Sequence, residues 1–281
     1  MKKRNSLKSL LILMAWVCVM GMHAQTSYQN KLKELFNANT TLMNLDAEQQ
    51  VDAYANMLKM GGMGEADAKA LCQKYFSTQF MNDMVEVVSP YYEKVLSEAD
   101  INSLIEQLNT PAGKLSTNHI GKATKQMSSP EAQGFMQKAM MSILQGQKAE
   151  EVKPEACSAV YQQKFNEYYT VTNTAANITS VISSLEPALM GQAQTSEQKT
   201  QMRNLLNSLS SFLTTNMKTF ALNTFHPEVT EADLDFYINF SKSPAGQNLI
   251  KGGSAMTKDA MNMGTKLVEK FTLWVAKQQS K

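Results

Sequence analysis

Arginine, histidine, glycine and proline are scarce in this chain of 281 residues, and their scarcity narrows the classes of function. The only arginines are Arg4 and Arg203, which excludes a site built on several guanidinium–phosphate contacts. The 3 histidines are too few for most His-based zinc or iron centres. The sequence also has no Gly-rich phosphate loop, nucleophile elbow or His-Glu-x-x-His motif, so no familiar enzyme class is indicated.

The first 24 residues have the three parts of a secretory signal. A basic head is followed by an apolar run over residues 10–22, and Ala24 offers a small side chain before Gln25. Met22 is larger than the residue usually found two positions before the cut, so the cleavage site is defined only to within a few residues. No later stretch approaches 18 uninterrupted apolar residues, so we expect an exported mature chain without a transmembrane helix.

Cleavage would leave a chain with almost balanced charge. It removes 4 of the 27 basic residues and none of the 25 acidic ones, which leaves 23 against 25 and a formal charge of −2. Proteins that bind nucleic acids normally carry a basic surplus on one face. The composition therefore argues against a nucleic-acid partner.

Helical patterns dominate the mature sequence. Four apolar residues keep the spacing that places them on one helical face: Ile101, Leu104, Ile105 and Leu108. Helix starts are marked by residue pairs typical of capping boxes or by a first-turn proline, at Asp46/Gln49, Ser97/Asp100, Thr195/Gln198 and Ser129-Pro130. Alternating β-branched runs closed by turn residues are absent, so the sequence predicts an all-α fold.

The chain aligns with itself at a shift of 133 residues. Residues 97–101 (SEADI) fall on residues 230–234 (TEADL), and Ile105 falls on Ile238. The similarity fades beyond about Met127. We therefore predict two tandem helical-bundle units with long amphipathic helices, over residues 25–150 and 151–281, after the signal at residues 1–24. A charged linker near 147–154 would join them, and the sequence leaves open whether the two units share one core.

A second repeated segment is Ser/Thr-Pro-Ala-Gly, at residues 110–113 and 243–246. The hydroxyl would cap a helix that begins with the proline, while alanine and glycine leave room for the preceding helix to approach closely. The alternative is an anion site at the helix N-terminus. Lys114 in one unit is replaced by the uncharged Gln247 in the other, which weakens that alternative.

These segments resemble the bacterial exported family called domain of unknown function 2059. The closer match is Phe240-Ser241-Lys242-Ser243-Pro244-Ala245-Gly246-Gln247, and the weaker one is residues 108–114, which lack the aromatic residue. The resemblance implies an all-helical fold and export to the periplasm or beyond. It carries over no catalytic or binding residue.

The last helix is expected to be one long element. Apolar or small residues recur at steps of three and four over about seven turns, at Leu249, Gly253, Met256, Ala260, Met263, Leu267, Phe271 and Trp274. Phe271 and Trp274 should anchor its end against the second unit.

The two mature cysteines, Cys72 and Cys157, both lie on apolar stripes with helical spacing. The favoured interpretation is two buried thiols that behave as small hydrophobic groups. An exported protein would also permit a Cys72–Cys157 disulfide, and the sequence leaves both possibilities open.

Three further patterns each have a chemical and a structural interpretation. Paired methionines such as Met60/Met63, Met140/Met141 and Met261/Met263 could hold Cu(I), but methionine more often fills gaps in helical cores. The repeated pairs Glu98/Asp100 and Glu231/Asp233 could perform acid–base chemistry, but carboxylates are also favourable in the first turn of a helix. His119 and His226 have no counterpart in the other unit, so surface positions are favoured.

The tyrosine pairs Tyr91-Tyr92 and Tyr168-Tyr169 should each put one ring inward and one nearer the surface, where it could serve a partner. We assign no catalytic, cofactor-binding or metal-binding residue. The leading hypothesis is a non-enzymatic binding or interaction module of the bacterial cell envelope, with a protein or envelope component as partner. The alternative is a carrier or chaperone for apolar ligands that uses a Met-rich groove between helices.

Overall fold

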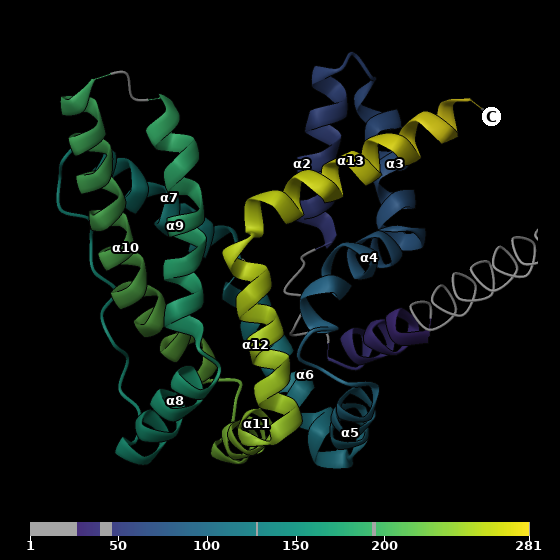
Figure 1. Cartoon of the computed structure of the whole chain (residues 1–281). Helices are drawn as coiled ribbons and strands as arrows, with labels where there is room; N and C mark the ends of the chain where they lie inside the picture. The colour runs from purple at the N-terminus through teal and green to yellow at the C-terminus, as the bar shows by residue number, and fades with distance from the viewer. Residues whose placement is uncertain (1–26, 40–46, 128, 193–194, 281) are drawn as a thin grey trace, which may run out of the picture.

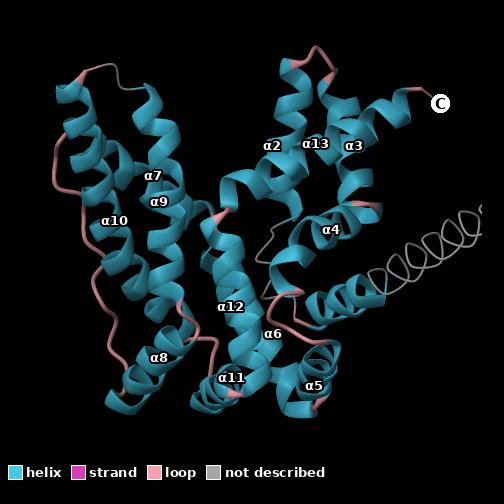
Figure 2. Ribbon diagram, viewed as in Figure 1, coloured by secondary structure: helices cyan, strands magenta, loops and turns pink. Residues whose placement is uncertain are grey.

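The computed structural model describes residues 27–39, 47–127, 129–192 and 195–280. Every regular element among these residues is a helix, as Figure 2 shows, which confirms the predicted all-α class. No helix within the described ranges has both the length and the apolar content needed to span a bilayer. The predicted signal and the helix start at Asp46 lie outside the described residues.

After a first helix over residues 27–38, the chain forms α2 (Ala47–Met60), α3 (Glu65–Thr78), α4 (Phe80–Tyr92), α5 (Glu98–Asn109), α6 (Pro111–Met127), α7 (Pro130–Leu144), α8 (Ala159–Val171), α9 (Thr174–Gln192), α10 (Ser196–Phe225), α11 (Glu231–Lys242), α12 (Pro244–Lys258) and α13 (Ala260–Gln279). The predicted linker near 147–154 falls in the non-helical segment between α7 and α8. Side chains of α10 hold this segment, since Asn216 accepts from the Val152 amide at 2.7 Å and Asn223 accepts from the Glu155 amide at 2.9 Å.

The helices repeat at the shift found in the sequence. Moving the first copy by 133 residues places the helix over residues 27–38 on α8, α2 on α9, α3 and α4 on α10, α5 on α11, α6 on α12 and α7 on α13. The repeat therefore continues beyond Met127, where the sequence similarity fades. An ion pair repeats too, with Lys31–Glu98 at 3.0 Å in the first copy and Lys164–Glu231 at 3.7 Å in the second.

The helix starts repeat in atomic detail. Ser97 and Asp100 form a capping box at α5, and Thr230 and Asp233 form the equivalent box at α11. The predicted capping box of Thr195 with Gln198 at α10 and the cap of Ser129 at α7 are also present.

The Ser/Thr-Pro-Ala-Gly segments also have equivalent geometry. Thr110 and Ser243 each accept a hydrogen bond, at 3.0 Å, from the amide of the glycine three residues later. A Cβ on Gly113 would lie 2.4 Å from the Gln107 carbonyl oxygen, and one on Gly246 would lie 1.9 Å from the equivalent oxygen of Phe240. The predicted close approach of consecutive helices is confirmed at both sites.

The two copies exchange their C-terminal helices. In the first copy α6 packs against α10 and α11, and α7 packs against α10, all of which belong to the second copy. Reciprocally, α12 packs against α4 and α5, and α13 packs against α3 and α4. One hydrophobic core extends from Tyr28 to Val275 through both copies, which answers the question that the sequence left open.

The predicted long last helix is wrong, because it is divided into α12 and α13 at Asp259 (Figure 1). The Asp259 carboxylate accepts hydrogen bonds from the Tyr91 hydroxyl and the Asn262 amide at the bend. Beyond the bend α13 crosses the first copy. There the ring centres of Trp274 and Phe271 lie 5.2 Å and 4.9 Å from the ring centre of Tyr75. The anchor is therefore on the first copy, not on the second as expected.

Substitution of Gly246 tests the close approach of α11 and α12. We expect Gly246→Ala to lower the free energy of unfolding by about 2 kcal/mol or more, because the new methyl overlaps backbone that cannot move independently. The control is Gly264→Ala in α13, where an added Cβ meets nothing within 4 Å and where alanine favours the helix by about 0.5–1 kcal/mol. Urea unfolding measures both, and equal midpoints would contradict the packing.

Candidate functional site

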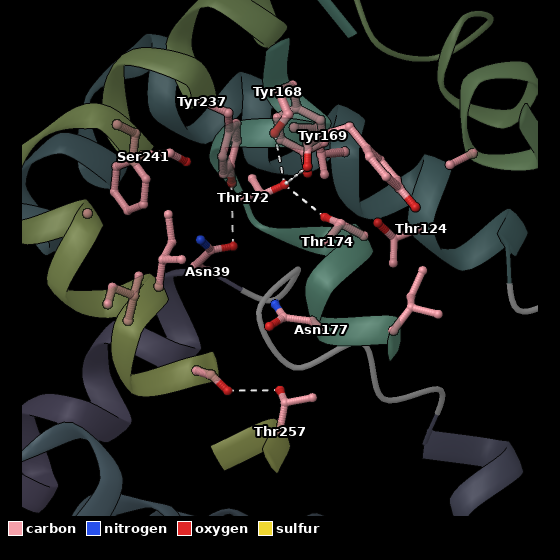
Figure 3. Close-up of a pocket in the computed structure, with 18 of the residues that line it drawn as sticks. Asn39, Thr124, Tyr168, Tyr169, Thr172, Thr174, Asn177, Tyr237, Ser241 and Thr257 are labelled. Carbon is pink, nitrogen blue, oxygen red and sulfur yellow. Dashed lines mark hydrogen bonds between the residues drawn. The ribbon is translucent and has the colours of Figure 1, made fainter. Parts of the chain in front are cut away.

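A pocket of about 390 Å³ lies where the two copies meet. Its walls come from α6 and the residues Asn39 and Tyr92 of the first copy, and from α8 to α12 of the second (Figure 3). We call it the seam pocket. It is about two and a half times the size of a 150 Å³ cavity, which holds a benzene molecule, and lies within the usual range for ligand sites.

Repeat-equivalent residues line the seam pocket in pairs. Four pairs related by the shift of 133 residues reach it from both copies: Asn39/Thr172, Tyr92/Phe225, Ile120/Gly253 and Thr124/Thr257. Because both members of each pair line the same space, the pocket receives equivalent positions from both copies. It consequently depends on the exchange of α6 and α12.

Rings and thioethers make up much of the wall. Six rings of the second copy line it, from Phe165, Tyr168, Tyr169, Phe225, Tyr237 and Phe240. Met127, Met217 and Met256 join them from three different helices. These side chains favour a ligand with a large apolar surface, because rings stack on apolar groups and methionine adapts to irregular shapes.

Most polar groups around the pocket are already paired within the protein. Thr172 donates to the Tyr168 carbonyl at 2.8 Å and lies 2.8 Å from the Thr174 hydroxyl. The Tyr237 hydroxyl lies 3.4 Å from the Asn39 side-chain oxygen, a contact drawn as a dashed line in Figure 3. The same hydroxyl lies 2.9 Å from the Thr117 hydroxyl. These pairs leave little polar surface for an ionic ligand.

The lining of the seam pocket, as far as the structure describes it, contains no carboxylate, imidazole, amine or thiol. No group of three or more His, Cys, Asp or Glu residues capable of holding a metal occurs among the described residues. The arrangement is suited to enclosing a neutral molecule by contact and by a few hydrogen bonds.

The repeated carboxylates have different surroundings in the two copies. Asp233 is only 2% exposed and accepts bonds from Ser116 at 2.8 Å and from His119 at 2.8 Å, both on α6 of the other copy. Asp100, its equivalent, accepts only a 3.3 Å bond from Asn248 across the seam. Sequence reasoning placed His119 on the surface and missed this contact, because its partner is 114 residues away.

The hydrogen bonds of Asp233 stabilise its charged form. Burial raises the pKa of this carboxyl, but the bonds from Thr230, His119 and Ser116 outweigh burial and hold the pKa below its ordinary value. Asp233 therefore joins the two copies as an anion.

The remaining sequence candidates do not gather at the pocket. Cys72 and Cys157 are free thiols, so the disulfide alternative is not formed. Burial raises the pKa of Cys72 to about 11, which keeps this thiol protonated and unreactive. Cys157 precedes α8 and packs, partly buried, against the core that contains Tyr161 and Phe165, whereas Val160 is 53% exposed and does not belong to the expected apolar stripe.

Each of the three methionine pairs has one exposed member, while Met63 and Met263 pack against the core. Met60, Met141 and Met261 are exposed and lie on three different helices. His226 is exposed, as expected. In the tyrosine pairs Tyr92 and Tyr169 are buried while Tyr91 and Tyr168 are partly exposed, which confirms the expected division.

Fold and pocket together define an all-α tandem-repeat protein with a pocket between its two copies. The model of a bacterial family described as "Uncharacterized protein conserved in bacteria (DUF2059)" matches the chain twice, over residues 82–145 and 216–272. The two matches are consistent with two copies of this domain and cover corresponding stretches, from the start of α4 to the end of α7 and from the last third of α10 into α13. No curated protein and no solved structure matches the chain.

Replacement of Asp233 tests the contact between the copies. We expect Asp233→Asn to lower the free energy of unfolding at pH 7 by about 1–3 kcal/mol, because an amide cannot accept all these bonds. The loss should shrink as the pH falls below about 4, because a carboxyl with a lowered folded-state pKa stabilises the fold above its unfolded-state pKa and loses that effect on protonation.

The matched control is Asp100→Asn. It removes the same capping bonds from Ser97 but no contact with Ser116 or His119, so a loss of about 1 kcal/mol is expected. Urea unfolding of both variants between pH 3 and pH 7 gives the comparison. Equal losses at pH 7 would show that the bonds from Ser116 and His119 to Asp233 add nothing beyond the single bond from Asn248 to Asp100.

Proposed function

We propose that this protein is a non-enzymatic binding protein of the bacterial cell envelope, and that it carries a compact, mostly apolar molecule in the seam pocket. The observation that supports this is the composition of the pocket wall, which has seven aromatic rings, three methionines and no charged side chain among the lining residues that the structure describes. Among the two sequence hypotheses, the pocket favours the carrier for apolar ligands over a module that recognises a protein or envelope component.

The ligand site is a place where binding and folding reinforce each other. A molecule in the seam pocket contacts α6 of the first copy and α12 of the second at the same time. It binds the folded chain and loses these contacts on unfolding, so it raises the apparent stability by mass action. A change that weakens the packing between the two copies would then favour release of the ligand.

A neutral fluorescent probe tests the proposal. N-phenyl-1-naphthylamine should bind the full-length protein saturably, in a one-to-one ratio, with increased emission. Ala221→Phe adds a ring at a buried alanine that lines the pocket and should weaken binding at least about tenfold. The control Ala276→Phe adds the same ring on the exposed side of α13 and should leave binding unchanged.

Thermal unfolding with and without the probe completes the experiment. The probe should raise the melting temperature of the native protein and of Ala276→Phe, but not that of Ala221→Phe. Native mass spectrometry of protein purified without detergent should show an additional bound mass that Ala221→Phe lacks. Absence of probe binding and of any bound mass in the native protein would refute the carrier function.

The proposal includes export, which rests on the basic, apolar and small-residue segments of the first 24 residues. Protein recovered from bacterial cells should begin at Gln25 or within a few residues of it, and should be found in the envelope fraction. N-terminal sequencing after fractionation is the measurement. An intact leader in the cytoplasmic fraction would contradict export.

A further inference from the structure

An open groove, which we call the outer groove, lies between the turn that joins α8 to α9 and the outer side of α12. In this region α9 and α12 run side by side (Figure 1). Ile250 lines both the seam pocket and the outer groove. The Ser254 hydroxyl, in the outer groove, donates at 3.0 Å to the side-chain oxygen of Asn177, which lines the seam pocket. The two spaces therefore meet at these side chains.

One face of α12 gives the outer groove a positive charge. Lys251, Ser254 and Lys258 follow one another at steps of three and four residues, so they share this face, with the hydroxyl between the two ammonium groups. Both lysines are exposed, and the described lining of the outer groove contains no carboxylate. Asp259 lines an adjacent groove together with Lys258, but its carboxylate already accepts hydrogen bonds at the bend between α12 and α13. The face therefore offers two ammonium groups and a hydroxyl to an anion.

The repeat does not require this face. At the shift of 133 residues Lys251 corresponds to Asn118 and Ser254 corresponds to Gly121, so only Lys258 has a basic equivalent. Yet α6 and α12 start with the same cap and make the same close approach to the preceding helix. The pattern of lysine, serine and lysine is therefore specific to the second copy, and neither the helix nor the exchange of helices depends on it.

The Ser254 hydroxyl is held in place by the turn between α8 and α9. The side-chain amide of Asn173 donates to it at 3.1 Å, and the hydroxyl in turn donates to Asn177. Asn173 has a left-handed backbone with φ of 56°, a conformation that asparagine tolerates better than most residues. An anionic group in the outer groove would replace the Asn177 oxygen as the acceptor for Ser254, while Asn173 continues to orient the hydroxyl.

We propose that the carried molecule is an amphiphile with one anionic head, and that its apolar body lies in the seam pocket while its head lies in the outer groove between Lys251 and Lys258. This inference rests on the proposed carrier function. The described lining of the seam pocket is uncharged, so a charged head is stable only outside it.

The volume of the seam pocket limits the size of the apolar body. A pocket of about 390 Å³ has room for about twelve to sixteen carbon atoms, by comparison with benzene in a cavity of 150 Å³. This size fits one acyl chain or a small ring system, and it is too small for the two chains of a phospholipid. The inferred ligand class is therefore a single-chain or ring-based acid.

A matched pair of probes tests the site for the head. Dodecanoate and dodecanamide have the same chain and nearly the same head shape, but only dodecanoate is charged. Each is titrated into the full-length protein, and binding is measured by displacement of N-phenyl-1-naphthylamine. The native protein should bind dodecanoate about tenfold more tightly than dodecanamide, as expected for a few exposed contacts between opposite charges.

The double variant Lys251→Gln/Lys258→Gln should lower this ratio to about one and leave the binding of dodecanamide unchanged, because neither lysine lines the seam pocket. The control Lys122→Gln/Lys125→Gln removes two exposed lysines of α6 and should keep the tenfold ratio. The two variants have the same net charge, so a difference between them reports the position of the lysines. Added salt should lower the ratio in the native protein, because it screens exposed charges.

Each other outcome has a distinct meaning. A ratio that persists in Lys251→Gln/Lys258→Gln, or that is also lost in Lys122→Gln/Lys125→Gln, would overturn the inference while the carrier function stands. Tighter binding of dodecylammonium than of dodecanoate by the native protein would overturn the anionic ligand class. If the native protein binds none of these amphiphiles and does not bind the fluorescent probe, the carrier function itself fails.

Discussion

Each copy of the repeat depends on the other to cover its first helices. The α6–α7 pair of the first copy packs on α10 and α11, and the α12–α13 pair of the second packs on α3, α4 and α5. Both exchanges begin at a glycine where consecutive helices approach so closely that a methyl group would overlap backbone. The sharp turn at Gly113 and Gly246 directs each exchanged pair, and the shared core follows from it. The single chain therefore has the arrangement of a domain-swapped dimer, and the seam pocket lies where its two copies meet.

The two copies differ in the side chains that their last helices meet in the other copy. In the first copy a cluster of rings surrounds Tyr75, with Phe271 and Trp274 contributed by α13. In the second copy the positions equivalent to Tyr75, Phe76 and Phe80 hold Ser208, Leu209 and Leu213, none of which lines the pocket. Duplication permits this difference, because α13 packs on the ring cluster of the first copy while its equivalent, α7, packs on α10 of the second.

Local features of the sequence predicted the local features of the structure. The capping boxes at Ser97 and Thr195 and the close approach at Gly246 depend on residues within seven positions of each other, and they were predicted correctly. The bend at Asp259 was missed, because an apolar stripe of helical period continues through it and the contact of Tyr91 that stabilises it comes from another copy. Pairing of helices over a hundred residues apart leaves no mark in a single sequence.

The same reasoning explains how far the site could be foreseen. The sequence indicated a Met-rich groove and drew attention to Tyr168-Tyr169, but the methionines that line the pocket are Met127, Met217 and Met256, and not the conspicuous pairs. His119 and Ser116 had no visible relation to Asp233, since that contact exists only once α6 is exchanged. The sequence thus contains the residues of the pocket but does not show that they lie together in the fold.

The exchange of helices is tested most directly by hydrogen exchange of the full-length protein, followed by mass spectrometry at increasing urea concentration. Since one core contains both copies, the backbone amides of α5, α6, α11 and α12 should become exchangeable together, in a single cooperative opening with one dependence on urea. If α5 and α6 open at a lower urea concentration while α11 and α12 stay protected, each copy folds on its own and the account is contradicted.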